Sequence, residues 1–266
     1  MRRIGLRIAY DGASYVGWQK QENGLSIQEV IENTIEQLFH ERISLMGSGR
    51  TDAGVHALGQ VAAMDLSHPI PTENLKKALN ANLPEDIRIF DVWEADPLFH
   101  PRFDAKRKTY GYTFFCGEVM PPSKRSYEAH ISYELDISAM KEACAHFIGT
   151  HDFKAFRSSG GMNLSTARTV YDAALDSQDA SGEDLLHGSS YIFRVTGNGF
   201  LYNMVRIMAG TLFEIGKGKI TADRIDEAYQ TGDRNLLGPT APAQGLCLLN
   251  VSYDLSDEKK APQKER

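Results

Sequence analysis

A glycine-rich stretch separates two strand-like segments of the chain: Gly47-Ser48-Gly49-Arg50-Thr51-Asp52-Ala53-Gly54-Val55-His56. Its three glycines predict a tightly turned loop that another backbone or a ligand can approach closely. Asp52 is the only acid between Glu41 and Asp65. Because Arg50 stands two residues away, we expect this carboxylate to stay ionised, which makes it a candidate nucleophile. The alternative is an aspartate that only hydrogen-bonds the turn.

Outward from this loop, the hydrophobic periodicity predicts strands and helices that do not alternate regularly. Strands are expected at 3–10, 43–46, 58–66, 87–93, 107–116, 168–175, 191–196 and 246–253. A helix capped by Ser26 is expected over 27–39, and a helix capped by Thr72 is expected to run to about residue 81. Further helices are expected at 138–148, 202–215 and 221–230. This order predicts an α+β fold with antiparallel sheets. We expect an N-terminal domain over 1–104 that carries the Asp52 loop, a C-terminal domain over 105–255, and a disordered tail over 256–266.

The charge balance argues against a protein that coats nucleic acid indiscriminately, since 29 Lys and Arg stand against 35 Asp and Glu, a net charge of −6. The distribution is less even than this sum. Residues 97–125 hold six basic and two acidic residues, and the windows 153–171 and 185–213 contain no acid. These three regions favour a localised anion-binding surface over scattered solvated faces.

Other sequence features narrow the class of protein. Cys116, Cys144 and Cys247 stand too far apart to form a disulfide framework or paired zinc ligands. His56 and His68 have no partner at metal-ligand spacing, so no metal site is expected. Arginines interrupt the N-terminus where a signal peptide needs an apolar stretch, and no apolar run has the length of a membrane-spanning helix. The sequence therefore predicts a cytoplasmic protein without membrane association.

A basic and aromatic strand begins near the expected domain boundary. Lys106, Arg107 and Lys108 precede a run in which Tyr110, Tyr112 and Phe114 share one face. Cations beside aromatic rings suit the binding of an unpaired base and its phosphates. The alternative is an ordinary core strand, and only one of the three rings needs to be functional.

Arg206 stands on an apolar helix beside Met204, Val205, Ile207 and Met208. Burying a guanidinium is unfavourable unless an anion meets it. Asp52 and a phosphate are both candidates for that anion. The glycines at 197 and 199 precede this helix but lack the remainder of a phosphate-binding loop, so nucleotide-cofactor binding is not expected.

The whole pattern resembles the bacterial tRNA pseudouridine synthase A family over residues 3–253. The run 49–57 is similar to the signature of that family. Further blocks match in order: Trp18-Gln19-Lys20-Gln21 with Ser26-Ile27-Gln28, Phe103-Asp104-Ala105 with Lys108-Thr109-Tyr110, Phe156-Arg157-Ser158-Ser159-Gly160, Phe200-Leu201-Tyr202-Asn203-Met204-Val205-Arg206, and Gly238-Pro239-Thr240-Ala241-Pro242 with Gly245-Leu246. Gly161, where relatives often carry Cys, and the loop 118–125 depart from the pattern.

The resemblance implies an enzyme that isomerises uridine to pseudouridine at positions 38, 39 and 40 of the tRNA anticodon stem-loop. It implies two similar α+β domains with mixed, mainly antiparallel sheets flanked by helices and joined across a central cleft. The working unit would be a homodimer, and no cofactor would be required.

The resemblance also implies roles for individual residues. Asp52 would be the nucleophile, Tyr110 would stack on the target uracil, Arg206 would pair with Asp52, Arg50 would hold the flipped nucleotide, and Leu246 would pack against the base. Contacts with the RNA backbone are expected from Lys106, Arg107, Lys108, Arg157 and Arg168.

Three questions remain open at this point. The carboxylate can add to C6 of uracil or attack C1′ of the ribose, and either Tyr110 or water can remove the C5 proton. The alternatives to this function are a synthase for other tRNA positions, a non-catalytic RNA-binding module, and a hydrolase of nucleosides or glycosides. The hydrolase is disfavoured because such enzymes use two carboxylates and Asp52 has no acidic neighbour.

Overall fold

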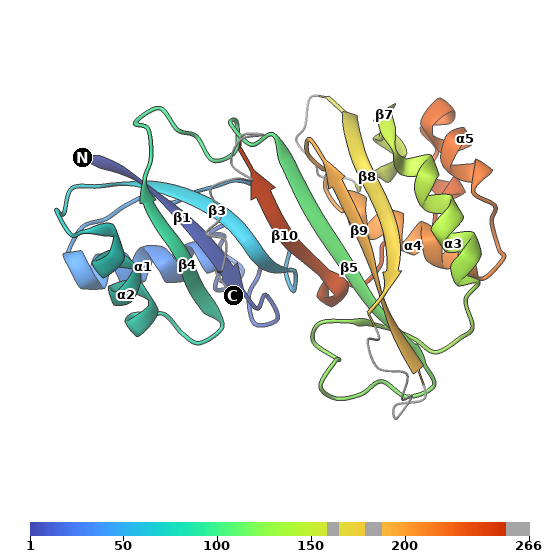
Figure 1. The fold of residues 1–266 in the computed structure, drawn as a ribbon, viewed down its shortest axis with the longest axis horizontal. Helices are drawn as coiled ribbons and strands as arrows, with labels where there is room; N and C mark the ends of the chain where they lie inside the picture. The colour runs from blue at the N-terminus through green and yellow to red at the C-terminus, as the bar shows by residue number, and fades with distance from the viewer. Residues whose placement is uncertain (159–164, 179–187, 254–266) are drawn as a thin grey trace, which may run out of the picture. The chain divides into compact units, whose positions relative to one another are not determined.

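A computed structural model describes residues 1–158, 165–178 and 188–253. Within these ranges the chain has an α+β fold with a mixed sheet flanked by helices, which confirms the predicted fold class (Figure 1). Two compact units are present: Met1–Lys108 with Leu248–Arg266, and Thr109–Cys247. The expected domains 1–104 and 105–255 stay a prediction, and the compact units differ from them in placing the chain from Leu248 onward with the first unit. The predicted tail lies outside the described residues.

The sheet of the first unit is built around a buried central strand. Its strands are β1 (Arg2–Tyr10), β2 (Met46–Gly47), β3 (His56–Leu66), β4 (Ile87–Glu94) and, for most of its length, β10 (Leu246–Ser252), in the order β4-β1-β3-β10 with β2 beside β3. β1 pairs antiparallel with both neighbours, so that Leu6 faces Ala62 on β3 and Val92 on β4. All of β3 is buried or nearly so except Leu58 and Asp65. The alternation in the sequence therefore predicted these strands correctly, apart from 43–45, which are not in a strand.

Two helices complete this unit. α1 (Ile27–Phe39) begins where the Ser26 hydroxyl accepts a hydrogen bond from the Glu29 amide at 3.2 Å, as the sequence predicts. Its residues Ile27, Ile31 and Ile35 are fully buried. α2 (Thr72–Asn82) packs against β4 and contacts α1 (Figure 1). The expected Thr72 cap is wrong, because Thr72 is the first helical residue and the extended Pro71 precedes it without a side-chain hydrogen bond.

The described part of the second unit contains five strands and three α-helices (Figure 1). Its strands are β5 (Arg107–Gly117), β6 (Ala129–Ile131), β7 (Gly149–Asp152), β8 (Ala167–Ser177) and β9 (Gly188–Gly197), in the order β5-β9-β8-β7. β6 pairs parallel with β5, whereas β8 pairs antiparallel with β7 and β9. The helices are α3 (Ile137–Ala143), α4 (Met204–Gly216) and α5 (Asp223–Thr231). Short 3-10 helices lie at Cys144–Phe147, Lys154–Phe156, Arg234–Leu236 and Ala243–Gly245.

Three predicted helices differ from the structure by two or more residues at an end, and one of them, expected over 221–230, begins only at Asp223. The helix expected over 138–148 begins at Ile137, because the Asp136 carboxylate accepts a hydrogen bond from the Ala139 amide at 2.9 Å, and it tightens into a 3-10 turn after Ala143. The helix expected from Tyr202 begins only at Met204. Asn203 has a left-handed backbone, with φ 62°, which no α-helix can continue through.

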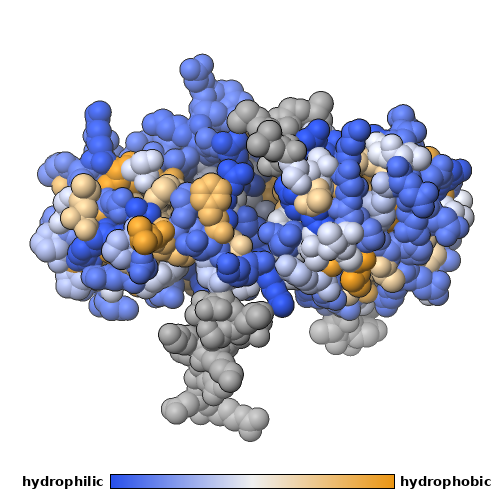
Figure 2. Space-filling view, turned by 90° about the horizontal axis from the view of Figure 1, so that it is seen from above, coloured by the Kyte–Doolittle hydropathy of each residue, from blue (hydrophilic) through white to orange (hydrophobic). Residues whose placement is uncertain are grey.

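The surface seen in Figure 2 is mostly hydrophilic, and hydrophobic side chains form small, separate patches on it. Phe90, Leu98 and Phe103 are among the exposed apolar side chains of the first unit. In the ranges that the structure describes, no helix combines the length and the apolar character needed to cross a membrane.

Candidate active site

The glycine-rich loop before Asp52 is anchored by a buried polar pair. The Ser48 hydroxyl donates to Oε1 of Gln60 at 2.6 Å, and Nε2 of Gln60 donates to the Gly49 carbonyl at 2.9 Å. Ser48 and Gln60 are both fully buried, so these bonds satisfy groups that water cannot reach. The Lys108 ammonium donates to the Ser48 carbonyl at 2.6 Å. The beginning of the loop is therefore fixed from β3 and from Lys108.

The segment 11–18 holds the other side of the loop. The Trp18 amide donates to the Thr51 carbonyl at 3.0 Å, and Gly17 forms an isolated β-bridge with Asp52. Gly17 has φ +111°, and a Cβ atom there would lie 2.5 Å from the Thr51 carbonyl oxygen. Only glycine permits both this conformation and this approach. Asp52 is thus carried on a backbone that is held from two directions, with its side chain half-buried.

His56 closes the same loop. Its Nδ1 atom accepts a hydrogen bond from the Gly12 amide at 3.0 Å, and the side chain is 5% exposed. Asp11 lies beside it, with a carboxylate oxygen 3.1 Å from Nδ1. These contacts are those of a structural histidine.

The predicted cations of the first unit lie in different environments. Arg50 is exposed, and among the described residues it forms no ion pair. Lys106 is exposed as well, whereas Arg107 and Lys108 are half-buried. Lys108 contacts the Asp52 loop itself, a role that the sequence pattern did not indicate.

In the second unit, the ring of Tyr110 is more exposed than the rings of Tyr112 and Phe114 on the same strand. Its ring packs edge-on against Phe200, with the ring centroids 5.2 Å apart, and it retains 8% exposure. Tyr112 donates its hydroxyl to the Pro242 carbonyl at 2.9 Å, and burial raises the pKa of Tyr112 above its usual value. Phe114 packs against Phe213 of α4. Tyr112 and Phe114 are therefore core residues, and the stacking of Tyr110 on a base stays a prediction.

Two neutral acceptors contact the Arg206 guanidinium near the start of α4. Its Nε donates to the Ala241 carbonyl at 2.7 Å, and Nη1 donates to Oδ1 of Asn203 at 2.9 Å. The side chain is half-buried on a helix whose other residues, apart from Glu214, are buried. Leu246, at the start of β10, is 7% exposed.

The remaining predicted cations are half-buried in the second unit. Nη1 of Arg168 donates to the carbonyls of Ser165, at 3.0 Å, and Ala167, at 2.6 Å. Arg157 ends the 3-10 turn Lys154–Phe156. Part of the matching block after Arg157, the residues 159–160, lies outside the described residues, as does Gly161.

The structure thus gathers the candidate residues in two groups. Asp52, Arg50 and Lys106–Lys108 belong to the first compact unit, and Tyr110, Arg157, Arg168, Arg206 and Leu246 belong to the second. The pairing of Arg206 with Asp52 stays a prediction. The sequence interpretation missed Asn203, because it placed this residue inside the helix expected over 202–215, where an asparagine gives no sign of a partner far along the chain.

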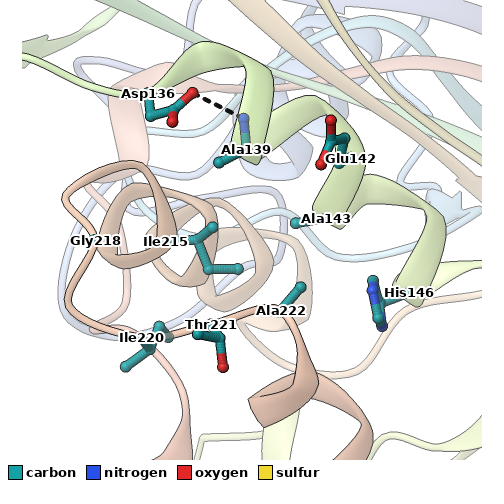
Figure 3. A pocket seen from close by; sticks show the side chains of 10 residues that line it. All are labelled: Asp136, Ala139, Glu142, Ala143, His146, Ile215, Gly218, Ile220, Thr221 and Ala222. Carbon is teal, nitrogen blue, oxygen red and sulfur yellow. Dashed lines mark hydrogen bonds between the residues drawn. The ribbon is translucent and has the colours of Figure 1, made fainter.

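A cavity of about 390 Å³ lies elsewhere in the second unit (Figure 3). Glu142, His146 and Ile215 are among its lining residues, which come from α3, the turn after it and the end of α4. None of the predicted site residues lines it. Within the described ranges, no group of three or more His, Cys, Asp and Glu side chains is placed to hold a metal ion.

Comparison with known proteins identifies the family. A family model described as tRNA pseudouridine synthase matches residues 7–104 and 143–254. The chain is 46% identical to tRNA pseudouridine synthase A of Geobacter sulfurreducens over 253 residues, which cover 95% of this chain and 100% of that protein. It is 44% identical to tRNA pseudouridine synthase A of Acetivibrio thermocellus and 43% identical to that of Thermoanaerobacter sp. strain X514, with the same coverage.

These matches define an isomerase class, in agreement with the resemblance seen in the sequence. The chain belongs to the tRNA pseudouridine synthase family.

Proposed function

We propose that this protein isomerises uridine to pseudouridine in tRNA, at positions 38, 39 and 40 of the anticodon stem-loop, with Asp52 as the nucleophile. One observation carries the proposal: the carboxylate of Asp52 stands half-buried on a loop whose backbone is fixed by β3 and by the segment 11–18. A nucleophile held in one geometry needs little reorganisation when it attacks. The relatives' names, tRNA pseudouridine synthase A, support the substrate class.

The proposed reaction breaks the bond from N1 of uracil to C1′ and forms a bond from C5 to C1′. A proton leaves C5, N1 gains one, and no electrons are transferred. Asp52 forms a transient bond to C6 of the base or to C1′ of the ribose, and that bond breaks before the product leaves. Arg206 pairs with the carboxylate, and Tyr110 supports the uracil that has left its stack. Either the Tyr110 hydroxyl or water takes the C5 proton.

The substrate contacts follow from the same proposal. Arg50 and Leu246 hold the flipped nucleotide and its base, and Lys106, Arg107, Lys108, Arg157 and Arg168 bind the RNA backbone. The protein works as a homodimer in the cytoplasm.

Asp52→Asn tests the assignment, because the amide keeps the size of the side chain but cannot act as the nucleophile. The measurement is tritium release from tRNA that carries uridine labelled at C5, which occurs only when C5 becomes the attachment point. We expect the rate to fall by at least about 10³-fold. Binding of tRNA should change by less than about tenfold, or 1.4 kcal/mol.

Asp65→Asn is the matched control, because Asp65 lies on β3 in an exposed ion pair with Arg3. Its rate should stay within about twofold of the wild type, since exposed ion pairs contribute little. Wild-type tritium release by folded Asp52→Asn protein contradicts the nucleophile assignment. Loss of the base from the RNA by the wild type indicates a hydrolase, and an unchanged RNA indicates a binding module.

A further inference from the structure

Asn203 stands at the cap position of α4, yet its side chain does not cap the helix. Asparagine at this position usually accepts a hydrogen bond from an amide of the first helical turn. Here no such bond forms, and the backbone is left-handed, with φ 62°. Asn203 and His40 are the non-glycine residues with positive φ in the described part of the chain. Such a conformation is unfavourable by about 1 kcal/mol or more, so other contacts must maintain it.

The amide group of Asn203 joins two segments that carry candidate substrate contacts. Its Nδ2 donates to the Ser158 hydroxyl at 3.0 Å, and its Oδ1 accepts from Nη1 of Arg206 at 2.9 Å. The Ser158 amide donates to the Tyr202 carbonyl at 3.2 Å, which adds a second link between the same segments. The residue before Ser158 is Arg157. One asparagine therefore connects the side chain of Ser158, the residue after Arg157, to the guanidinium of Arg206.

The chemistry of this link is informative because the amide is neutral. Oδ1 of Asn203 and the Ala241 carbonyl fix the guanidinium plane at two of its nitrogens. Neither acceptor carries a charge, so neither contact cancels the charge of Arg206. A carboxylate in place of the amide would form a stronger, charge-assisted bond and would neutralise the guanidinium.

We propose that Asn203 is a positioning residue, which holds Arg206 in one orientation without consuming its charge and couples it to the Arg157 segment. This inference rests on the proposed function, in which Arg206 pairs with Asp52. With this left-handed backbone, the amide bonds the side chains of Arg206 and Ser158 and no backbone amide of the first helical turn.

Two substitutions separate positioning from stability. Asn203→Gly accepts the left-handed backbone but removes the amide. Asn203→Asp keeps an acceptor for Arg206 and adds a negative charge. We expect kcat for pseudouridine formation to fall by about 10- to 100-fold in both variants, with KM changed by less than about threefold. The Tm of Asn203→Asp should stay at or above the wild-type value, so its loss of kcat would not follow stability.

The control is His40→Gly, which relaxes the other left-handed residue, at the end of α1, and should leave kcat unchanged. A wild-type kcat in folded Asn203→Asp, or a loss confined to KM, overturns the inference. A second readout does not depend on activity: ¹⁵N NMR should show slow rotation of the Arg206 guanidinium in the wild type and fast rotation in Asn203→Gly. Equal rotation in both overturns the inference as well. A wild type that forms no pseudouridine but shows the NMR difference refutes the proposed function alone.

Discussion

The hydroxyl of Tyr10 lies 2.7 Å from the hydroxyl of Thr51, in a buried contact that joins the end of β1 to the residue before Asp52. Tyr10 is 4% exposed and Thr51 is 6% exposed, so water cannot replace either partner. The Thr51 carbonyl is held in addition by the Trp18 amide. Thr51, the residue before Asp52, is therefore held through both its side chain and its backbone carbonyl.

Tyr10→Phe removes one partner of this contact and leaves the Thr51 hydroxyl buried without it. We expect the free energy of unfolding to fall by about 1 to 2 kcal/mol, measured by urea denaturation. Thr51→Val removes the other partner with little change of shape. If the contact matters, the double variant should lose less than the sum of the two single variants. Additive losses would mean that the two hydroxyls do not interact.

Gly17→Ala introduces a Cβ atom 2.5 Å from the Thr51 carbonyl oxygen at a backbone position with φ +111°. The loop must move or the strain must remain, so we expect a loss of more than about 2 kcal/mol in stability and a large loss of activity. Gly218→Ala is the matched control, because φ there is +69° but a Cβ atom has nothing within 4 Å. That variant should lose only about 1 kcal/mol and keep its kcat. Equal effects of the two substitutions on kcat would show that the approach of Gly17 to the loop is unimportant.

Lys106→Gln with Arg107→Gln should flatten the salt dependence of tRNA binding. The slope of log affinity against log salt concentration should fall by roughly 0.7 to 0.9 for each phosphate contact that is lost. The control is Lys77→Gln with Arg42→Gln, which removes the same amount of positive charge. Lys77 lies on α2, and Arg42 forms an exposed ion pair with Glu36. Lys108 is left intact because it binds the Ser48 carbonyl. The same slope in both double variants would assign Lys106 and Arg107 to a merely solvated face.

The thiols of Cys116 and Cys144 should react with alkylating reagents more slowly in the folded protein than in the unfolded chain. Burial raises the pKa of Cys116 to about 11 and that of Cys144 to about 12. At pH 8 only about one Cys116 side chain in a thousand is then a thiolate, against roughly a quarter for an ordinary thiol. Alkylation by iodoacetamide, followed by peptide mass spectrometry, should therefore be much slower in folded protein than in urea.

The same shifts set the sign of a stability change with pH. A raised pKa in the folded state means that the stabilisation is complete below the unfolded pKa of about 8.5. It is lost as the pH rises through about 11 to 12, the values for Cys116 and Cys144. If native Cys116 were alkylated as fast as it is in the unfolded chain, its pKa would not be raised in the folded protein, and neither the slow alkylation nor this pH dependence would hold.

The sequence predicted what depends on local patterns. The Ser26 cap, the buried isoleucines of α1 and the alternation in β1 are all encoded by neighbours in the chain. The start of α4 was predicted wrongly, because propensity cannot show that a contact with Ser158 holds Asn203 in a left-handed conformation. The link from Tyr10 to Thr51 was likewise invisible, since it joins residues 41 positions apart that only the folded sheet brings together.

The last described strand, β10, begins at the end of the second unit, yet it lies next to β3, and from Leu248 it belongs to the first unit. The second unit is continuous, over Thr109–Cys247. During translation, the second unit is therefore synthesised in full before most of the strand that completes the sheet of the first unit. Since domains fold as units during synthesis, the second can mature while the first still waits for its final strand. The loop that carries Asp52 therefore gains the last strand of its sheet only after the whole second unit has been synthesised.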